Sequence, residues 1–259
     1  MKVVIFCGGM GIRMGEATQK LPKPMILVDG RPILWHIMRW YASWGHTEFI
    51  LCTGYRAETI KGFFVAHDGG SGNGSLPKRM EDEQPGETEN WQITFLDTGV
   101  HASVADRLRA AKPYVGDDDI FLCTYGDGLT DAPLDRMIER LVESGKTGLF
   151  MSVRPRLSYH VVDADDDGNV RSIDPMAMAN VRINGGFFVF RGSIFEHLGA
   201  RDDIMEVGAR LARAGDMIAY RYDGFWAPMD TMKDKQDLDA MAANGSSPWL
   251  ASPSCLVAG

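Results

Sequence analysis

The chain has 259 residues, a length that fits one large domain or one domain with a small appendage. Hydrophobic residues make up 45% and charged residues 24%, as in globular domains that bury a substantial core. The formal net charge of -8 argues against a nucleic-acid partner, since binding nucleic acid requires a basic surface. A site for a single nucleotide stays open, because a few well-placed cations suffice for one triphosphate.

The cysteines and the apolar segments carry no signal for a disulfide framework, secretion or membrane insertion, so a cytoplasmic location is the default expectation. Cys7, Cys52, Cys123 and Cys255 form no CxxC pair, so neither a zinc site nor a disulfide framework is indicated. The apolar run Val3–Phe6 is too short for a signal peptide, and no stretch approaches the roughly 18 apolar residues of a membrane span. We therefore expect a cytoplasmic protein with no membrane partner.

The first part of the chain alternates between buried strands and amphipathic helices. The strands are continuous apolar runs closed by glycine, as in a parallel sheet, and the helices carry apolar residues at helical spacing. This order is typical of an α/β fold. In chain order the pattern predicts a strand over Val3–Cys7, a helix over Pro32–Ser43, a strand over Phe49–Thr53 and a helix over Glu58–Ala66.

Residues 67–90 interrupt the alternation with a glycine-rich stretch and then an acidic one. We expect a mobile surface loop there, with a lid or a subunit contact as the alternative.

The remaining chain continues with strands and helices. The pattern predicts strands over Trp91–Leu96, Ile120–Tyr125, Gly148–Arg154, Tyr159–Asp163, Val170–Ile173, Gly186–Phe190 and Met217–Tyr222, and helices over Ser103–Pro113, Leu134–Ser144, Ser193–Leu198, Met205–Gly215 and Met232–Ala243. The acidic run 163–168 lacks the closing glutamate of an EF-hand, so we expect a solvated hairpin turn. Residues 1–243 form one predicted domain. Residues 244–259, rich in Ser, Pro and Ala, form a predicted poorly ordered tail.

The first candidate site is the glycine-rich run Gly8–Arg13 directly after the first strand. Its glycines let the backbone approach a ligand and point amides at phosphate oxygens, although the run matches neither the Rossmann fingerprint nor a P-loop. Arg13 adds a rigid fork suited to phosphate. Lys23 follows between Pro22 and Pro24, which stiffen the backbone around this cation. The alternative for Lys23 is a solvated loop lysine.

Two aspartates suggest a magnesium site. Asp127 follows a buried strand, where α/β folds bind ligands, and Mg²⁺ takes one or two carboxylates plus substrate phosphates. Asp230, after the stiffening Pro228, is the second candidate. The alternatives are a simple turn aspartate at 127, and capping of the helix at 232 by Asp230 or Thr231.

A third loop, Asn184-Gly185-Gly186, suggests sugar recognition, because asparagine both donates to and accepts from hydroxyl groups. The alternative is a turn before a strand. His36 lies among apolar residues of a predicted helix, so we expect a packed histidine there.

Taken in order, these loops resemble the sugar-1-phosphate nucleotidylyltransferases, and within that family the glucose-1-phosphate cytidylyltransferase branch. The resemblance runs from residue 1 to about residue 250. The segments that carry it are Gly8–Arg13, Leu21–Met25, Pro32–Met38, Thr124–Gly128, Asn184–Phe188 and Pro228–Thr231.

The resemblance implies a Rossmann-like mixed, mostly parallel sheet flanked by helices, with a small sugar-binding β region. It implies that the phosphate of a sugar 1-phosphate, with glucose 1-phosphate first, attacks the α-phosphorus of a nucleoside triphosphate, with CTP first. Pyrophosphate leaves, and Mg²⁺ is the cofactor. The substrates are small molecules, and the family commonly assembles into symmetric homo-oligomers.

The same resemblance implies roles for individual residues. Catalytic roles fall to Arg13, Lys23 and Asp127. Asp127 and Asp230 are the implied magnesium ligands. The implied nucleotide-binding residues are Phe6, Gly8, Gly9, Gly11, Arg13, Lys23 and Gly126. The implied sugar-binding residues are Tyr125, Asn184 and Gly185.

Three departures from the family pattern matter. Ile12 replaces a threonine, Leu21 replaces a lysine, and Asp174-Pro175 stands where the family has Glu-Lys-Pro with a phosphate-binding lysine. Charge-assisted bonds contribute about 1.5–3 kcal/mol, so the last loss weakens acceptor binding unless another cation substitutes. The candidate substitutes are Arg154, Arg156 and Arg182.

These departures leave two alternatives open. One is the same reaction with another nucleotide or another phosphorylated or phosphonate acceptor. The other is a nucleotide-binding regulatory homologue without catalysis.

Overall fold

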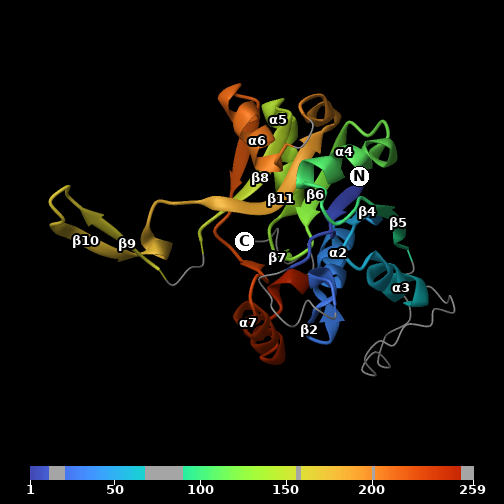
Figure 1. Ribbon diagram of the computed structural model, residues 1–259, viewed down its shortest axis with the longest axis horizontal. Coiled ribbons are helices and arrows are strands. Elements are labelled where there is room, and N and C mark those ends of the chain that lie inside the picture. Colours follow the sequence, from blue (N-terminus) through green and yellow to red (C-terminus); the bar gives the residue numbers. More distant parts are fainter. Residues whose placement is uncertain (12–20, 68–89, 156–158, 200–201, 252–259) are drawn as a thin grey trace.

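One large sheet organises the computed structural model, which describes residues 1–11, 21–67, 90–155, 159–199 and 202–251 (Figure 1). In the described chain the sheet has seven strands in the order β12-β8-β11-β6-β1-β4-β5. Only β11 runs antiparallel to its neighbours, so the predicted mixed, mostly parallel sheet is confirmed. The bounds are β1 Val3–Phe6, β4 Glu48–Thr53, β5 Gln92–Asp97, β6 Ile120–Tyr125, β8 Gly148–Val153, β11 Ile183–Arg191 and β12 Met217–Arg221.

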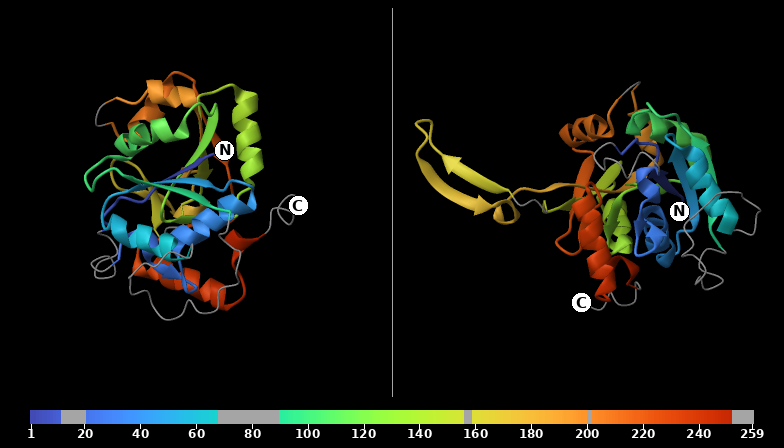
Figure 2. Two further views of the ribbon diagram at one scale, coloured as in Figure 1. Left: turned by 90° about the vertical axis from the view of Figure 1, so that its right-hand side faces the viewer. Right: turned by 60° about the horizontal axis from the view of Figure 1, so that its bottom comes forward.

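Helices cover both faces of this sheet (Figure 2). The central strands are apolar throughout because both of their faces are buried. Val3 and Ile5 pack into one hydrophobic cluster, and Val4 and Phe6 pack into the other. The first cluster also takes residues from α2 Ile33–Ser43, α3 Ala57–His67 and α5 Leu134–Ser144, and the second from α4 Val104–Val115 and α6 Ile204–Arg213.

In the part of the chain that the structure describes, three helices have a capping box at their N-terminus, in which a side chain at each position bonds the backbone N–H of the other. The pairs are Ser103 with Asp106 at α4, Asp203 with Glu206 at α6, and Thr231 with Asp234 at α7 Met232–Ala243. The helix predicted over Ser193–Leu198 is a 3-10 turn instead, η4 Gly192–Glu196.

Among the described residues, three small two-stranded sheets lie outside the large one. The strands of two of these sheets are too short to show a periodic hydrophobic pattern, so they could not be predicted from the sequence. These two sheets pair β2 Leu27–Val28 with β3 Arg31–Pro32, and β7 Gly128–Thr130 with β13 Trp226–Pro228. The third pairs β9 His160–Ala164 with β10 Val170–Pro175 in a hairpin that projects away from the large sheet (Figure 1). The predicted hairpin turn is confirmed, since Asp165 accepts bonds from the N–H groups of Asp167 and Asn169.

Part of the C-terminal segment packs against the domain. In residues 244–251, a 3-10 turn, η5 Pro248–Leu250, buries Trp249, whose Nε1 donates to Nδ1 of His36 at 3.1 Å. Nε2 of His36 in turn lies 2.8 Å from the Val28 carbonyl, and burial lowers the pKa of His36 to about 4. The packed role predicted for this histidine is confirmed. Residues 252–259 and 68–89 lie outside the described residues.

No helix in the described ranges combines the length and the hydrophobicity needed to cross a bilayer.

Candidate active site

The glycine-rich loop after β1 borders a cavity of about 450 Å³ at the carboxyl end of the sheet, and we call this the nucleotide-side cavity. The loop is tied to the neighbouring strand, because the Gly8 carbonyl accepts a bond from the Tyr55 N–H. Arg13 and Ile12 lie outside the described residues. Six of the predicted nucleotide-binding residues line the cavity together: Phe6, Gly8, Gly9, Gly11, Lys23 and Gly126.

A buried arginine under this loop was missed by the sequence analysis. Arg107 on α4 is only 4% exposed and lines the nucleotide-side cavity. It donates to the Thr53 carbonyl at 3.0 Å and to Thr98 Oγ1, and it forms no salt bridge among the described residues. A Cβ at position 8 would overlap its guanidinium, so Gly8 permits this close approach. No local motif marks Arg107, because its partners are more than 50 residues away or in an irregular loop.

Lys23 joins the two predicted magnesium ligands. It begins a 3-10 turn, η2 Lys23–Met25, that Pro22 precedes and Pro24 stiffens. Its Nζ lies 2.6 Å from Oδ2 of Asp127 and 2.6 Å from Oδ1 of Asp230. Burial alone lowers the pKa of Lys23, but the two carboxylates outweigh burial and the pKa is raised, so the ammonium is charged.

The backbone explains why these distant aspartates meet. Asp127 follows β6 and Asp230 follows β13, and the pairing of β7 with β13 joins the two loops. The Met229 N–H also donates to the Asp127 carbonyl at 2.8 Å. Gly126 packs tightly, because a Cβ there would lie 3.2 Å from both the Phe6 carbonyl oxygen and the Pro24 ring.

Asp230 is free of helix capping. Thr231 is the N-cap of α7, and its side chain accepts from the Asp234 N–H, so the capping alternative holds for Thr231 and not for Asp230. Two carboxylates that converge on one cation suit Mg²⁺, which takes oxygen ligands and completes its shell with substrate phosphates and water. Among the described residues no cluster of three or more His, Cys, Asp or Glu side chains exists that could hold a metal ion.

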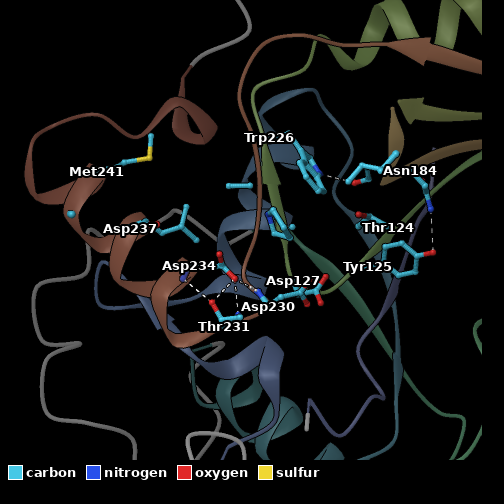
Figure 3. Close-up of a pocket in the computed structure, with 17 residues that line it drawn as sticks. Thr124, Tyr125, Asp127, Asn184, Trp226, Asp230, Thr231, Asp234, Asp237 and Met241 are labelled. Carbon is cyan, nitrogen blue, oxygen red and sulfur yellow. Dashed lines mark hydrogen bonds between the residues drawn. The ribbon is translucent and has the colours of Figure 1, made fainter. Parts of the chain in front are cut away.

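Figure 3 shows the lining of a second cavity, of about 890 Å³, which we call the sugar-side cavity. Asp127 and Asp230 line this cavity as well as the nucleotide-side cavity. The predicted sugar-binding residues Tyr125, Asn184 and Gly185 line the sugar-side cavity. Burial raises the pKa of Tyr125 to about 12, so its hydroxyl keeps its proton at neutral pH, and Asn184 Nδ2 lies 3.5 Å from that hydroxyl.

The position of the missing family lysine is remote from the large sheet. Asp174 lies on the hairpin strand β10 and is exposed. Of the candidate substitutes, Arg182 donates to the Ser152 carbonyl at 2.7 Å and pairs with Asp223 at 2.5 Å, and Arg154 pairs with Asp223 at 3.2 Å. Arg156 lies outside the described residues. Neither described arginine lines the two cavities.

The family model described as "Nucleotidyl transferase" matches residues 2–227, so the chain belongs to the nucleotidyltransferase family. The predicted family and enzyme class are thereby confirmed.

Relatives that match nearly the whole chain indicate which members of the family this chain is similar to in sequence. The chain is 37% identical to the "Probable glucose-1-phosphate cytidylyltransferase" of Bacillus subtilis (strain 168), covering 96% of this chain and 99% of the relative. It is 36% identical to the glucose-1-phosphate cytidylyltransferase of Salmonella typhi, covering 96% and 98%. A solved UDP-glucose pyrophosphorylase superposes with a TM-score of 0.70 at 14% identity, covering 94% and 98%, and supports the fold alone.

Proposed function

We propose that this chain transfers the cytidylyl group of CTP to glucose 1-phosphate, giving CDP-glucose and pyrophosphate with Mg²⁺ as cofactor. The observation that carries the proposal is the contact of Lys23 with both Asp127 and Asp230 at the junction of two cavities. The activity for which the relatives from Bacillus and Salmonella are named supports the choice of substrates.

The chemistry needs positioning and charge more than an activated side chain. A phosphate oxygen of the acceptor forms a bond to the α-phosphorus of the triphosphate, and the bond from that phosphorus to the bridging oxygen breaks, releasing pyrophosphate. The acceptor phosphate is already nucleophilic, so catalysis rests on in-line placement and neutralisation of negative charge. Lys23 is the proposed partner of the attacked phosphate and Arg13 of the leaving pyrophosphate. Asp127 and Asp230 are the proposed ligands of Mg²⁺, which supplies further charge neutralisation.

The two substrates are assigned to the two cavities. The proposed nucleotide contacts are Phe6, Gly8, Gly9, Gly11, Arg13, Lys23 and Gly126, and the six of them that the structure describes line the nucleotide-side cavity. The proposed sugar contacts are Tyr125, Asn184 and Gly185 in the sugar-side cavity.

One observation favours an alternative acceptor: Asp174-Pro175 stands where the family pattern has a lysine that binds phosphate. In this alternative the reaction is the same, but the acceptor is another phosphorylated compound or a phosphonate, or the nucleotide differs.

The test is pyrophosphate release with Mg²⁺ against a panel of four nucleoside triphosphates and several sugar 1-phosphates. We expect the highest kcat/KM for CTP with glucose 1-phosphate. Release with UTP or dTTP and none with CTP would overturn the choice of base. Nucleotide binding without release for any pair would favour the non-catalytic regulatory homologue, against which the joint presence of Lys23, Asp127 and Asp230 argues.

We also propose a cytoplasmic location, since nucleoside triphosphates and sugar phosphates are intracellular metabolites. The three described cysteines, Cys7, Cys52 and Cys123, are free thiols, which suits a reducing compartment.

We further propose that the chain forms a homo-oligomer through one face of the β9–β10 hairpin. Directly opposed residues share a face, so Val162 with Ile173 and Ala164 with Val170 form an apolar face. Val162, Val170 and Ile173 are each more than half exposed. The opposite face carries Asp163 and Ser172. An isolated two-stranded hairpin is only marginally stable, so a partner that covers the apolar face would stabilise it.

A second copy suits this apolar face on electrostatic grounds. The face carries no carboxylate or permanent cation, whereas Asp163 pairs with Arg171 on the other face. Two copies joined through their apolar faces therefore bury no charge and keep the acidic faces in water.

Two neighbouring substitutions test this contact by sedimentation velocity. Ile173→Asp places a charge on the apolar face and is expected to shift the chain to monomers. Ser172→Asp adds the same charge to the opposite face and is expected to leave the oligomer intact. A monomeric wild-type chain, or equal behaviour of the two variants, contradicts the proposal.

A further inference from the structure

The ammonium group of Lys23 contacts both proposed metal ligands, Asp127 and Asp230, and so lies where a metal ion bound to both would be expected. Its Nζ lies 2.6 Å from one oxygen of each carboxylate, so two of its three N–H donors are used there. The lysine side chain is 11% exposed, whereas those of Asp127 and Asp230 are 29% and 42% exposed. The ammonium is therefore the inner member of the cluster, and the carboxylates face the cavities.

The cluster differs from an ordinary structural ion pair in its location. All three residues line the nucleotide-side cavity, and both aspartates line the sugar-side cavity as well. The aspartates are brought together by backbone contacts of their own loops, namely the β7–β13 pairing and the Met229 bond to the Asp127 carbonyl. Two carboxylates held this close repel each other, and the ammonium between them neutralises that repulsion.

We propose that, before substrate binds, Lys23 holds Asp127 and Asp230 in place as a cationic stand-in for the metal, so that the site takes a divalent cation only together with a triphosphate. The inference rests on the proposed function. It adds an order of events to that function: free metal is excluded, and the metal enters with the nucleotide.

Charge is the physical reason for this selectivity. A divalent cation bound to both aspartates would lie within a few ångströms of the ammonium, and like charges at that distance repel strongly at a partly buried site. A triphosphate brings negative oxygens that accept the ammonium and release both carboxylates to the metal. Only the lysine side chain has to move, because Pro22 and Pro24 restrict the backbone on each side and the side chain has four rotatable bonds.

The test measures binding of Mn²⁺ alone, without nucleotide, from the electron paramagnetic resonance signal of the free ion. We expect weak binding by the wild type and at least tenfold tighter binding by Lys23→Met. Adding Asp127→Asn and Asp230→Asn to that variant is expected to remove the gain. Lys235→Met is the matched control, since it removes a lysine paired with Asp239 on α7 and changes the net charge equally.

A second variant guards against failure of Lys23→Met to fold. Lys23→Gln keeps a side chain that donates to carboxylates but carries no charge, and it is expected to show the same gain. Equal Mn²⁺ affinity in the wild type and in the folded Lys23 variants overturns the inference, as does an equal gain in Lys235→Met.

The Mn²⁺ binding test can be distinguished from the test of the proposed function, because it needs no catalytic turnover. Pyrophosphate release by the wild type with no gain in the variants overturns the inference alone. A gain in the variants with no release for any substrate pair overturns the proposed function alone.

Discussion

Replacement of Asp127 or Asp230 by asparagine is expected to lower kcat for pyrophosphate release at least about 100-fold in either variant. Asparagine keeps the size of the side chain but removes the charge that binds Mg²⁺ and pairs with Lys23. The loss is expected at saturating concentrations of both substrates, because charge neutralisation acts on the transition state. Steady-state kinetics with a coupled pyrophosphate assay measures it.

Asp119→Asn is the control for this pair. Asp119 forms an exposed ion pair with Arg191 at 2.8 Å and borders neither cavity, so its loss is expected to change kcat little. Turnover like that of the wild type in Asp127→Asn or Asp230→Asn would remove the residue concerned from the metal site.

The central strands were predictable because their pattern is local. Each of β1, β4 and β6 is a short apolar run buried on both faces and followed directly or within one residue by glycine. Such runs indicate a parallel sheet without any knowledge of their neighbours. The carboxyl ends of these strands also form the ligand-binding edge of an α/β sheet, which is why the sequence made Asp127 a candidate.

The rest of the site depends on contacts between residues far apart in the sequence, which no local sequence pattern predicts. The strands β7 and β13 have three residues each, yet their pairing brings Asp127 to Asp230, 103 residues further along the chain (230 − 127 = 103). Arg107 appears in the sequence as one of several charged residues on an amphipathic helix, and only its buried position under Gly8 gives it a place in the site. Trp249 lies in a segment rich in Ser, Pro and Ala, yet it is buried in the main hydrophobic cluster against His36 and Phe225.

Gly186→Ala is expected to weaken binding of the sugar 1-phosphate in the sugar-side cavity. Gly186 has a φ of +82°, in the left-handed region that side chains disfavour, and a Cβ there would overlap the Tyr125 ring. Its N–H also bonds Oδ1 of Asn184 at 2.9 Å. Displacement of Tyr125 and Asn184 together is expected to raise KM for the sugar 1-phosphate at least about tenfold, since each lost polar contact contributes about 1 kcal/mol.

Gly45→Ala separates the two costs in this prediction. Gly45 has a φ of +84°, but a Cβ there meets nothing within 4 Å, so the variant reports the backbone strain alone, about 1–3 kcal/mol of unfolding free energy. Gly186→Ala carries the same strain and adds overpacking against Tyr125, about 1–3 kcal/mol more. Denaturant unfolding measures both variants, and kinetics at varied sugar 1-phosphate shows whether KM rises only in Gly186→Ala. Equal stability losses with unchanged KM would mean that Tyr125 moves aside without affecting the acceptor, and the assignment of Tyr125 and Asn184 to the sugar would then be wrong.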